Sequence, residues 1–495
     1  MQQEIETQVP SCRIRNVGDR DLVNGKYVVY WMTAFRRVRS NFALQYARDL
    51  AIATDSSLLI LDALRIGYRW ASVRMHRFVI EGMVDNQQEL KACEKVAYYP
   101  YVEPEKGAAG GLVEELAKSA VAVVTDDYPC FFHPALLRLA SKKLSCPVIA
   151  VDSNGLMPIR YPDRTFTVAH SYRRYTQKEL PAHLRDGPDG EPLSADALAE
   201  LKPAPALRRD WLKRWPKADL KSLLKPDGLA DFAIDQSVQP AELQGGAKRA
   251  GQLLEQFVSR KLGVYSEDRN EPDLVGSSEL SPYLHFGHIS SHDIFNAVMH
   301  NENWTPDRLN KPNGKMNGFW GVGENAEAFL DQLCTWREIG FNMCARERKY
   351  DRLETLPDWT QKSIAEHADD PRQYVYSLEE FEQAKTHDKL WNAAQRQLVF
   401  EGRIHNYLRM LWGKKILHWT ASVKDALDIM VHLNNKYALD GRDPNSYSGI
   451  FWVLGRYDRA WGPVRPIFGK VRYMASENTA KKYSVKQYLK RYADN

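Results

Sequence analysis

Tryptophan and cationic side chains share one segment, residues 386–420, whose apolar residues repeat at helical spacing. Arg409 and Trp412 are three residues apart, and Trp412 and Trp419 are seven apart, so a helix would place them on one face. A tryptophan stripe of this kind usually packs in a core. The alternative is a path along which electrons hop beside a redox cofactor.

A second segment, residues 452–474, interleaves tryptophan with cations in a Pro- and Gly-containing stretch. Cations bind phosphates while aromatic rings stack on unpaired bases, so this pattern favours a nucleic-acid contact over a rigid loop with solvated charges. The predicted contacts are Arg456, Arg459, Trp461, Arg465, Lys470 and Arg472.

Two polar turns could bind a cofactor. Ser277, Ser278 and Ser281 surround a Gly-flanked turn that opens a helix, which suits a phosphate, although helix capping would need the same residues. The second turn holds Asn434, Asp440 and Asp443. Its amide and carboxylates could hydrogen-bond the polar edge of a ring such as a flavin, or they could bond their own backbone.

The elements that must position these residues fall into two groups. Residues 26–152 alternate short apolar runs (26–32, 57–62, 95–99, 120–126, 147–152) with helical patterns (41–51, 72–83, 111–119). This alternation predicts βαβ units, and hence a Rossmann-like α/β domain with a parallel sheet. Neither a GxGxxG motif after the first run nor a phosphate-binding P-loop is present, so an ordinary dinucleotide site is not expected.

Residues 181–206 are rich in Pro, Gly and Asp and indicate a linker, and from residue 240 onward the pattern is helical. We therefore expect an N-terminal tail (1–25), an α/β domain (26–175), a linker (176–235) and an all-α domain (236–490).

Composition narrows the class of protein. The chain has 495 residues, 44% of them hydrophobic, and no apolar run that would span a bilayer. The six cysteines form no CxxC pair or zinc-ligand cluster, so we expect reduced thiols, no metal and a cytoplasmic protein, nucleoid-associated if bacterial. Residues 456–491 hold ten Lys or Arg against two Asp or Glu, which could neutralise phosphates or be a solvated end of the chain.

Taken together, these segments resemble the photolyase/cryptochrome family, and most closely its class II photolyases. The resemblance starts near residue 13 and is carried by five motifs: YVVYWM (27–32), LSPYLHFGHIS (280–290), LWNAAQ with RIHNYLRMLWGKKILHW (390–419), YALDGRDPN (437–445) and RPIFGKVRYM (465–474). It implies a monomeric lyase whose all-α domain binds FAD. Its substrate would be the cyclobutane pyrimidine dimer of UV-damaged double- or single-stranded DNA. Excited reduced FAD would give an electron to the flipped-out lesion, which would split the dimer.

The resemblance also implies roles for single residues. Cofactor contacts are expected from Tyr265, Ser277, Ser278, Leu280, Ser281, Arg409, Asn434 and Asp440. Asn434 would face flavin N5, and Arg409 and Asp440 would form an ion pair that flanks the isoalloxazine. Trp412 and Trp391 would carry electrons from solvent to the flavin, with Trp419 and Tyr376 as branches. Trp336, Trp452, Met410 and Gln332 would contact the lesion.

This chain departs from the class II pattern at four places. Asp331 and Gln332 stand where two glutamates are usual, and the amide of Gln332 can donate a hydrogen bond but cannot transfer a proton. Asn435 stands in place of an aspartate, Ser446 in place of a glycine, and the run IGFN (339–342) is unusual.

Three alternatives stay open. A cryptochrome-like photoreceptor is compatible with Gln332, although Trp336, Trp452 and the basic loop favour repair. Repair of the (6-4) photoproduct would need a histidine acid, for which His405 is the candidate, although a structural role fits it better. A deazaflavin or folate antenna could pack beside Tyr30, Trp31 and Met32, which could equally be core residues.

Overall fold

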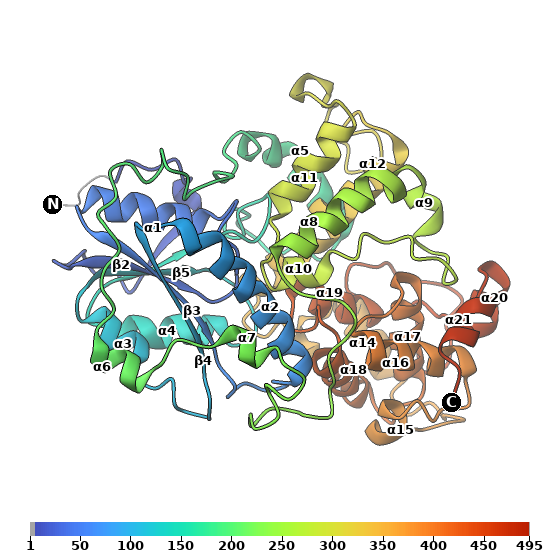
Figure 1. Ribbon diagram of the computed structural model, residues 1–495. Coiled ribbons are helices and arrows are strands. Elements are labelled where there is room, and N and C mark those ends of the chain that lie inside the picture. Colours follow the sequence, from blue (N-terminus) through green and yellow to red (C-terminus); the bar gives the residue numbers. More distant parts are fainter. Residues whose placement is uncertain (1–4, 495) are drawn as a thin grey trace.

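The computed structural model describes residues 5–494, and within them six strands form one sheet in the order β1-β6-β5-β2-β3-β4 (Figure 1). The strands are β1 (Ile14–Val17), β2 (Tyr27–Met32), β3 (Ser57–Leu64), β4 (Val96–Val102), β5 (Ala120–Asp126) and β6 (Val148–Val151). Strands β2 to β6 pair in parallel, and β1 pairs antiparallel with β6 at the edge.

Helices cover both faces of this sheet. α1 (Phe42–Ala53) packs on one face, and α3 (Leu112–Ala117) and α4 (His133–Lys143) pack on the other. Every residue of β2 and β5 is buried, which explains why these strands read as continuous apolar runs rather than as alternating patterns. The predicted α/β domain with a largely parallel sheet is confirmed.

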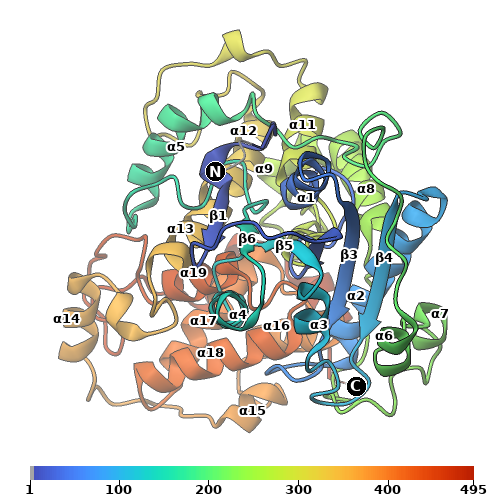
Figure 2. The ribbon, with the colours of Figure 1, turned by 90° about the vertical axis from the view of Figure 1, so that its left-hand side faces the viewer.

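The segment after α5 (Ala169–His183) covers the β4 side of the sheet. It contains α6 (Arg209–Arg214) and α7 (Leu220–Leu223), which lie beside β4 in Figure 2. Trp211 and Trp215 pack into the cluster under α3 and α4, and the backbone N–H of Ala218 donates to the carbonyl of Pro100. An edge strand covered in this way is protected from pairing with another chain.

The C-terminal part is helical. Its α-helices are α8 (Ala247–Gln256), α9 (Tyr265–Asp268), α10 (Ser281–His285), α11 (Ser291–Asn301), α12 (Glu324–Leu330), α13 (Glu338–Arg346), α14 (Asp358–Glu366), α15 (Leu378–Glu382), α16 (Lys389–Glu401), α17 (Asn406–His418), α18 (Val423–Tyr437), α19 (Pro444–Val453), α20 (Ser476–Lys482) and α21 (Lys486–Arg491). Two π-helical segments occur, η3 (Phe257–Lys261) and η6 (Asp331–Arg337). One hydrophobic cluster lies around α16 to α19 and another around α8 to α12.

Two features differ from the sequence expectations. Strand β1 lies inside the segment expected to be a tail, and α5 crosses the expected boundary at residue 175. β1 has the short, half-polar sequence IRNV and is held by its pairing with β6, which is distant in the sequence, so no local pattern indicates it. Within the described residues, no helix combines the length and apolar character that crossing a membrane requires.

Candidate functional site

Three segments bring polar side chains together between the helices. Nη2 of Arg409, on α17, lies 3.1 and 3.3 Å from the two carboxylate oxygens of Asp440, in the turn after α18. The hydroxyl of Ser281, the first residue of α10, donates to the same carboxylate at 2.9 Å. The side chains of Arg409 and Asp440 keep 27% and 13% of their area exposed, so both remain accessible to a ligand.

The last turn of α18 directs two asparagines to different partners. Nδ2 of Asn434 donates to Oγ of Ser446 on α19 at 2.5 Å. Nδ2 of Asn435 donates to the hydroxyl of Tyr447 at 3.1 Å, and its Oδ1 accepts the backbone N–H of Arg442 at 2.8 Å. Asn435 is therefore used inside the fold, whereas Asn434 is oriented by a serine that a glycine could not replace.

Asp443 joins the helical part to the α/β domain. One carboxylate oxygen caps α19 by accepting the backbone N–H of Asn445 at 2.8 Å, and the other accepts the hydroxyl of Tyr128 at 2.8 Å. Burial raises the pKa of Asp443, but the hydrogen bond with His285 and the nearby charges outweigh burial and hold it below its usual value. Bonding to the local backbone, here as a helix cap, is the alternative that the sequence left open for this residue; the bond to Tyr128 was not foreseen.

The serine loop before α10 is flanked by charge that the sequence analysis missed. Lys261 pairs with Glu279 at 3.0 Å, and Arg403 pairs with the same carboxylate. The predicted cofactor residues Tyr265 and Leu280 are buried nearby in the cluster around α8 to α12. The loop thus combines hydroxyls, an apolar floor and two cations that pair with Glu279 and Glu401, a set that suits a ligand with a polar and an aromatic part. Local sequence could not indicate the pairing of Arg403 with Glu279, because 124 positions separate them.

The predicted electron-transfer residues form a connected series. Trp391, Trp412 and Trp419 are at most 2% exposed. The indole N–H of Trp412 donates to Oε1 of Gln395 at 2.9 Å, and that of Trp391 donates to the carbonyl of Trp412 at 3.0 Å. The rings of Trp391 and Trp419 have centroids 6.2 Å apart, and those of Trp419 and Tyr376 are 5.8 Å apart. Tyr376 is half-buried and lies at the outer end of the series.

The indole of Trp336 is hydrogen-bonded to an aspartate that also forms an ion pair. It lies on η6, where its indole N–H donates to Oδ2 of Asp331 at 3.1 Å. The same carboxylate accepts Nε and Nη2 of Arg173 on α5, at 2.6 and 3.0 Å. Asp331 is thus a positioning residue for Trp336. The neighbouring Gln332, which stands where the class II pattern has its second glutamate, is half-buried. π-Helical segments occur frequently at functional sites.

Trp452, at the end of α19, is half-buried beside two cations. Nζ of Lys414 lies 5.7 Å from a Trp452 ring centroid, and the guanidinium of Arg472 lies 5.8 Å from it. Lys414 donates to the carbonyl of Val453, and burial lowers the pKa of its amine to about 7. Trp336 and Trp452 pack against the same hydrophobic cluster, and Met410 is half-buried on α17, which contacts α19. Sequence spacing did not indicate Lys414 or Arg173.

The basic loop presents most of its predicted residues. Arg459, Arg465 and Lys470 are exposed, and Arg459 stacks on Trp461 at 4.8 Å. Arg472 lies between Trp461 and Trp452, 5.0 Å from the former.

Arg456 differs from its prediction as a DNA contact, because it is 1% exposed. Its guanidinium donates to the carbonyl of Thr355 and lies over the ring of Tyr457, so it supports the loop from inside. The accepting carbonyl lies 101 positions earlier in the chain, so the local sequence pattern does not indicate this role.

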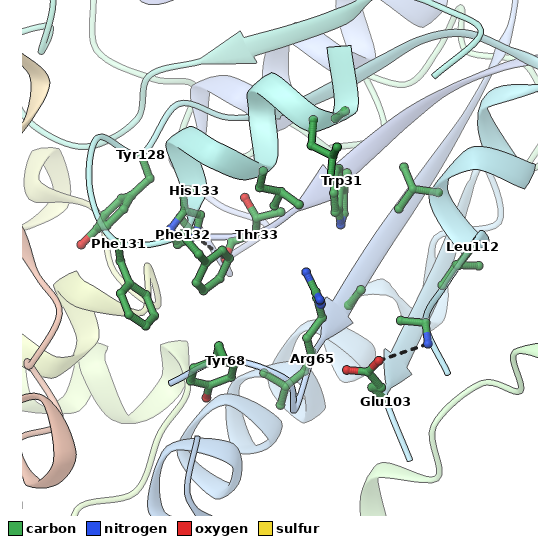
Figure 3. Close-up of a pocket in the computed structure, with 18 of the residues that line it drawn as sticks. Trp31, Thr33, Arg65, Tyr68, Glu103, Leu112, Tyr128, Phe131, Phe132 and His133 are labelled. Atoms are coloured by element: carbon green, nitrogen blue, oxygen red, sulfur yellow. Dashed lines mark hydrogen bonds between the residues drawn. The ribbon is translucent and has the colours of Figure 1, made fainter. Parts of the chain in front are cut away.

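A cavity of about 310 Å³ lies at the carboxyl ends of the strands, between the sheet and the helical part. Figure 3 shows Trp31, Tyr68, Phe131 and Phe132 around it, with Arg65 directed into it. His285, Phe286 and Arg442 line its helical side. Tyr30 and Met32 do not line it and are fully buried in the core, so among the three residues considered for an antenna, Trp31 faces this space.

Comparisons with known proteins cover nearly the whole chain. No protein-family model matches it. It is 33% identical over 488 residues to the deoxyribodipyrimidine photo-lyase of Methanothermobacter thermautotrophicus, covering 97% of each chain. It is 30% identical over 470 residues to that of Potorous tridactylus, covering 93% of this chain and 80% of the other. The crystal structure of a bacterial class III photolyase from Agrobacterium tumefaciens superimposes with a TM-score of 0.67 over 96% of this chain and 88% of that one, at 16% identity, which supports the fold.

Proposed function

The chain belongs to the photolyase/cryptochrome family, and from this premise we propose that it repairs cyclobutane pyrimidine dimers in DNA by light-driven electron transfer from reduced FAD. One arrangement carries the proposal. Helix α19, which carries Trp452, packs against α17, which carries Arg409, and against η6, which carries Trp336, so the polar group around Asp440 and the two tryptophans lie on neighbouring elements. A cofactor and a base could therefore be held side by side.

The polar groups between the helices fit FAD. Ser277, Ser278, Lys261 and Arg403 suit its diphosphate, and the guanidinium of Arg409 next to the isoalloxazine would favour an anionic reduced ring. FAD, when bound, supplies the light-excited electron donor. Asn434 would face flavin N5, and because Ser446 engages its amide nitrogen, its oxygen is the group left to accept a hydrogen bond.

The remaining residues would bind the lesion. Trp336 and Trp452 would stack on the flipped-out bases, whose damaged stacking lowers the cost of extrusion. Asp331 and Arg173 keep Trp336 in place, and the amide of Gln332 would donate a hydrogen bond to the dimer.

An oligonucleotide with one cyclobutane thymine dimer tests the proposal. Reduced, FAD-loaded protein should restore the two thymines under blue light and leave the dimer intact in the dark. A protein that binds FAD and reduces it under light but repairs no dimer would contradict the proposal and favour a photoreceptor.

His405 is a poor candidate for the histidine acid that repair of the (6-4) photoproduct would need. Burial lowers the pKa of His405 to about 4, so this imidazole is neutral at physiological pH and is a poor proton donor.

The basic loop should contact DNA phosphates. Arg459→Ala or Arg465→Ala should weaken binding to any duplex and reduce the slope of log K against log salt by about 1 for each arginine removed. Binding titrations at several salt concentrations measure this slope. Lys118→Ala, just after α3 of the α/β domain, is the matched control and should leave it unchanged. An equal change in the salt slope of all three variants would mean that the loop is not part of the DNA interface.

We further propose that the cavity beside Trp31 holds an antenna chromophore, a deazaflavin or a folate. Its aromatic walls suit a flat ring, and Arg65 supplies a cation for an anionic tail. Ala109→Trp, in the cavity wall, should remove the second absorption band from protein expressed in a host that makes the chromophore, while FAD is retained. Ala230→Trp, exposed on the linker, should keep both bands. An unchanged second absorption band in Ala109→Trp would exclude this cavity as the site of the antenna chromophore.

A further inference from the structure

We propose that Tyr376 and His387 form a proton-coupled redox pair at the outer end of the tryptophan series, in which His387 takes the phenolic proton as Tyr376 gives up an electron. The inference rests on the electron-transfer part of the proposed function. It assigns a new role to His387 and a mechanism to Tyr376.

The two side chains are joined by a short hydrogen bond. The hydroxyl of Tyr376 lies 2.7 Å from Nδ1 of His387, and the backbone N–H of His387 donates to the same hydroxyl oxygen at 3.1 Å. In the tautomer of His387 that carries its proton on Nε2, the hydroxyl of Tyr376 donates its proton to Nδ1. A separation of 2.7 Å is within the range over which a side-chain base removes a proton.

Both members of the pair contact the last buried tryptophan. The ring of Trp419 lies 5.8 Å from that of Tyr376 and 4.8 Å from that of His387. The backbone N–H of Tyr376 donates to the carbonyl of Trp419 at 2.9 Å, which fixes the loop against the end of α17. An oxidised Trp419 would therefore lie in direct contact with an electron donor that has its base already in place.

The step balances in charge and atoms. One electron passes from the Tyr376 phenol to the Trp419 radical cation, the phenolic O–H bond breaks, and an N–H bond forms at Nδ1 of His387. The products are neutral Trp419, a neutral tyrosyl radical and an imidazolium. Without a base, the oxidised phenol would have to keep a proton that it holds very weakly, so the transfer would be unfavourable.

The surroundings allow the proton to leave. His387 is exposed, so its other ring nitrogen can exchange a proton with water, and Tyr374 stacks on the imidazole with a centroid separation of 3.9 Å. Once the proton has gone, return of the electron from the flavin requires a proton to come back as well. The pair would thus prolong the reduced state that repair needs.

The test compares His387→Phe, Tyr376→Phe and the control His418→Phe. The first substitution keeps an aromatic ring under Tyr374 but removes the base. The ring centroid of His418 lies 6.3 Å from that of Trp419, and its Nδ1 has no hydrogen-bond partner among the described residues. Electron paramagnetic resonance after a light flash on FAD-loaded protein should detect a tyrosyl radical in the parent and in His418→Phe. His387→Phe should reduce its yield by about 100-fold and leave a tryptophan radical instead.

Two further measurements separate the possible failures. Imidazole added to His387→Ala should restore the tyrosyl radical. In protein without FAD, ¹⁵N resonances should identify Nδ1 of His387 as a hydrogen-bond acceptor, and Tyr376→Phe should remove that signature. A yield of tyrosyl radical that is unchanged in His387→Phe would contradict the role of His387 as the base but leave the electron-transfer path intact. A parent protein that forms neither radical would overturn the electron-transfer path, and the pair with it.

Discussion

Replacing Trp412 with phenylalanine should reduce light-driven reduction of the bound flavin to background and spare dimer repair by protein that has been reduced chemically. Trp412 is 2% exposed on α17, in the helix that carries Arg409, and is one of the two tryptophans predicted to carry electrons to the flavin. Phenylalanine fills similar space but is much harder to oxidise. Repair itself uses an electron that the flavin already holds, so it does not need Trp412.

Absorption spectra under continuous blue light measure the first activity, and the dimer-bearing oligonucleotide measures the second. Trp304→Phe is the matched control. Trp304 lies after α11, outside the series of electron-transfer residues, and its indole N–H donates to the carbonyl of Trp320. Loss of the indole leaves the buried Gln395 oxygen without its partner, at a cost of about 1–3 kcal/mol, so FAD retention must be checked for each variant. Equal loss of both activities would contradict the role of Trp412.

Asp331→Ala should lower the free energy of unfolding by about 3–5 kcal/mol, because it leaves the guanidinium of Arg173 largely buried without its partner. It also removes the acceptor of the Trp336 indole N–H, so affinity for dimer-bearing DNA should fall together with stability. Urea unfolding and a binding titration measure the two effects.

Asp331→Asn keeps an oxygen for the Trp336 indole but removes the charge, so it should lose stability and retain much of the affinity for the lesion. The double variant Asp331→Ala/Arg173→Ala should be less destabilised than the sum of the single variants, because no unpaired charge remains. Strict additivity would mean that the side chains of Asp331 and Arg173 do not interact, which would contradict the ion pair.

The sequence by itself was sufficient for the α/β sheet and the helical C-terminal part. The strands are buried on both faces, and the long helices bury one face, so each leaves a local pattern of apolar residues that can be read without coordinates. The five motifs indicated which residues to examine, and the structure brings Ser281, Arg409 and Asp440 together.

The tertiary structure decided which polar residues are committed to the fold. Arg456 occupies a position where charge suggested a contact with DNA, yet its guanidinium bonds inside the protein. The structure also shows hydrogen bonds that the neighbouring sequence does not reveal: from Arg173 to Asp331, from Asn434 to Ser446, and between Tyr376 and His387. The physical reason is that apolar burial is periodic along a helix or strand, whereas a hydrogen bond or ion pair depends on two atoms meeting, and only the folded chain brings those atoms together.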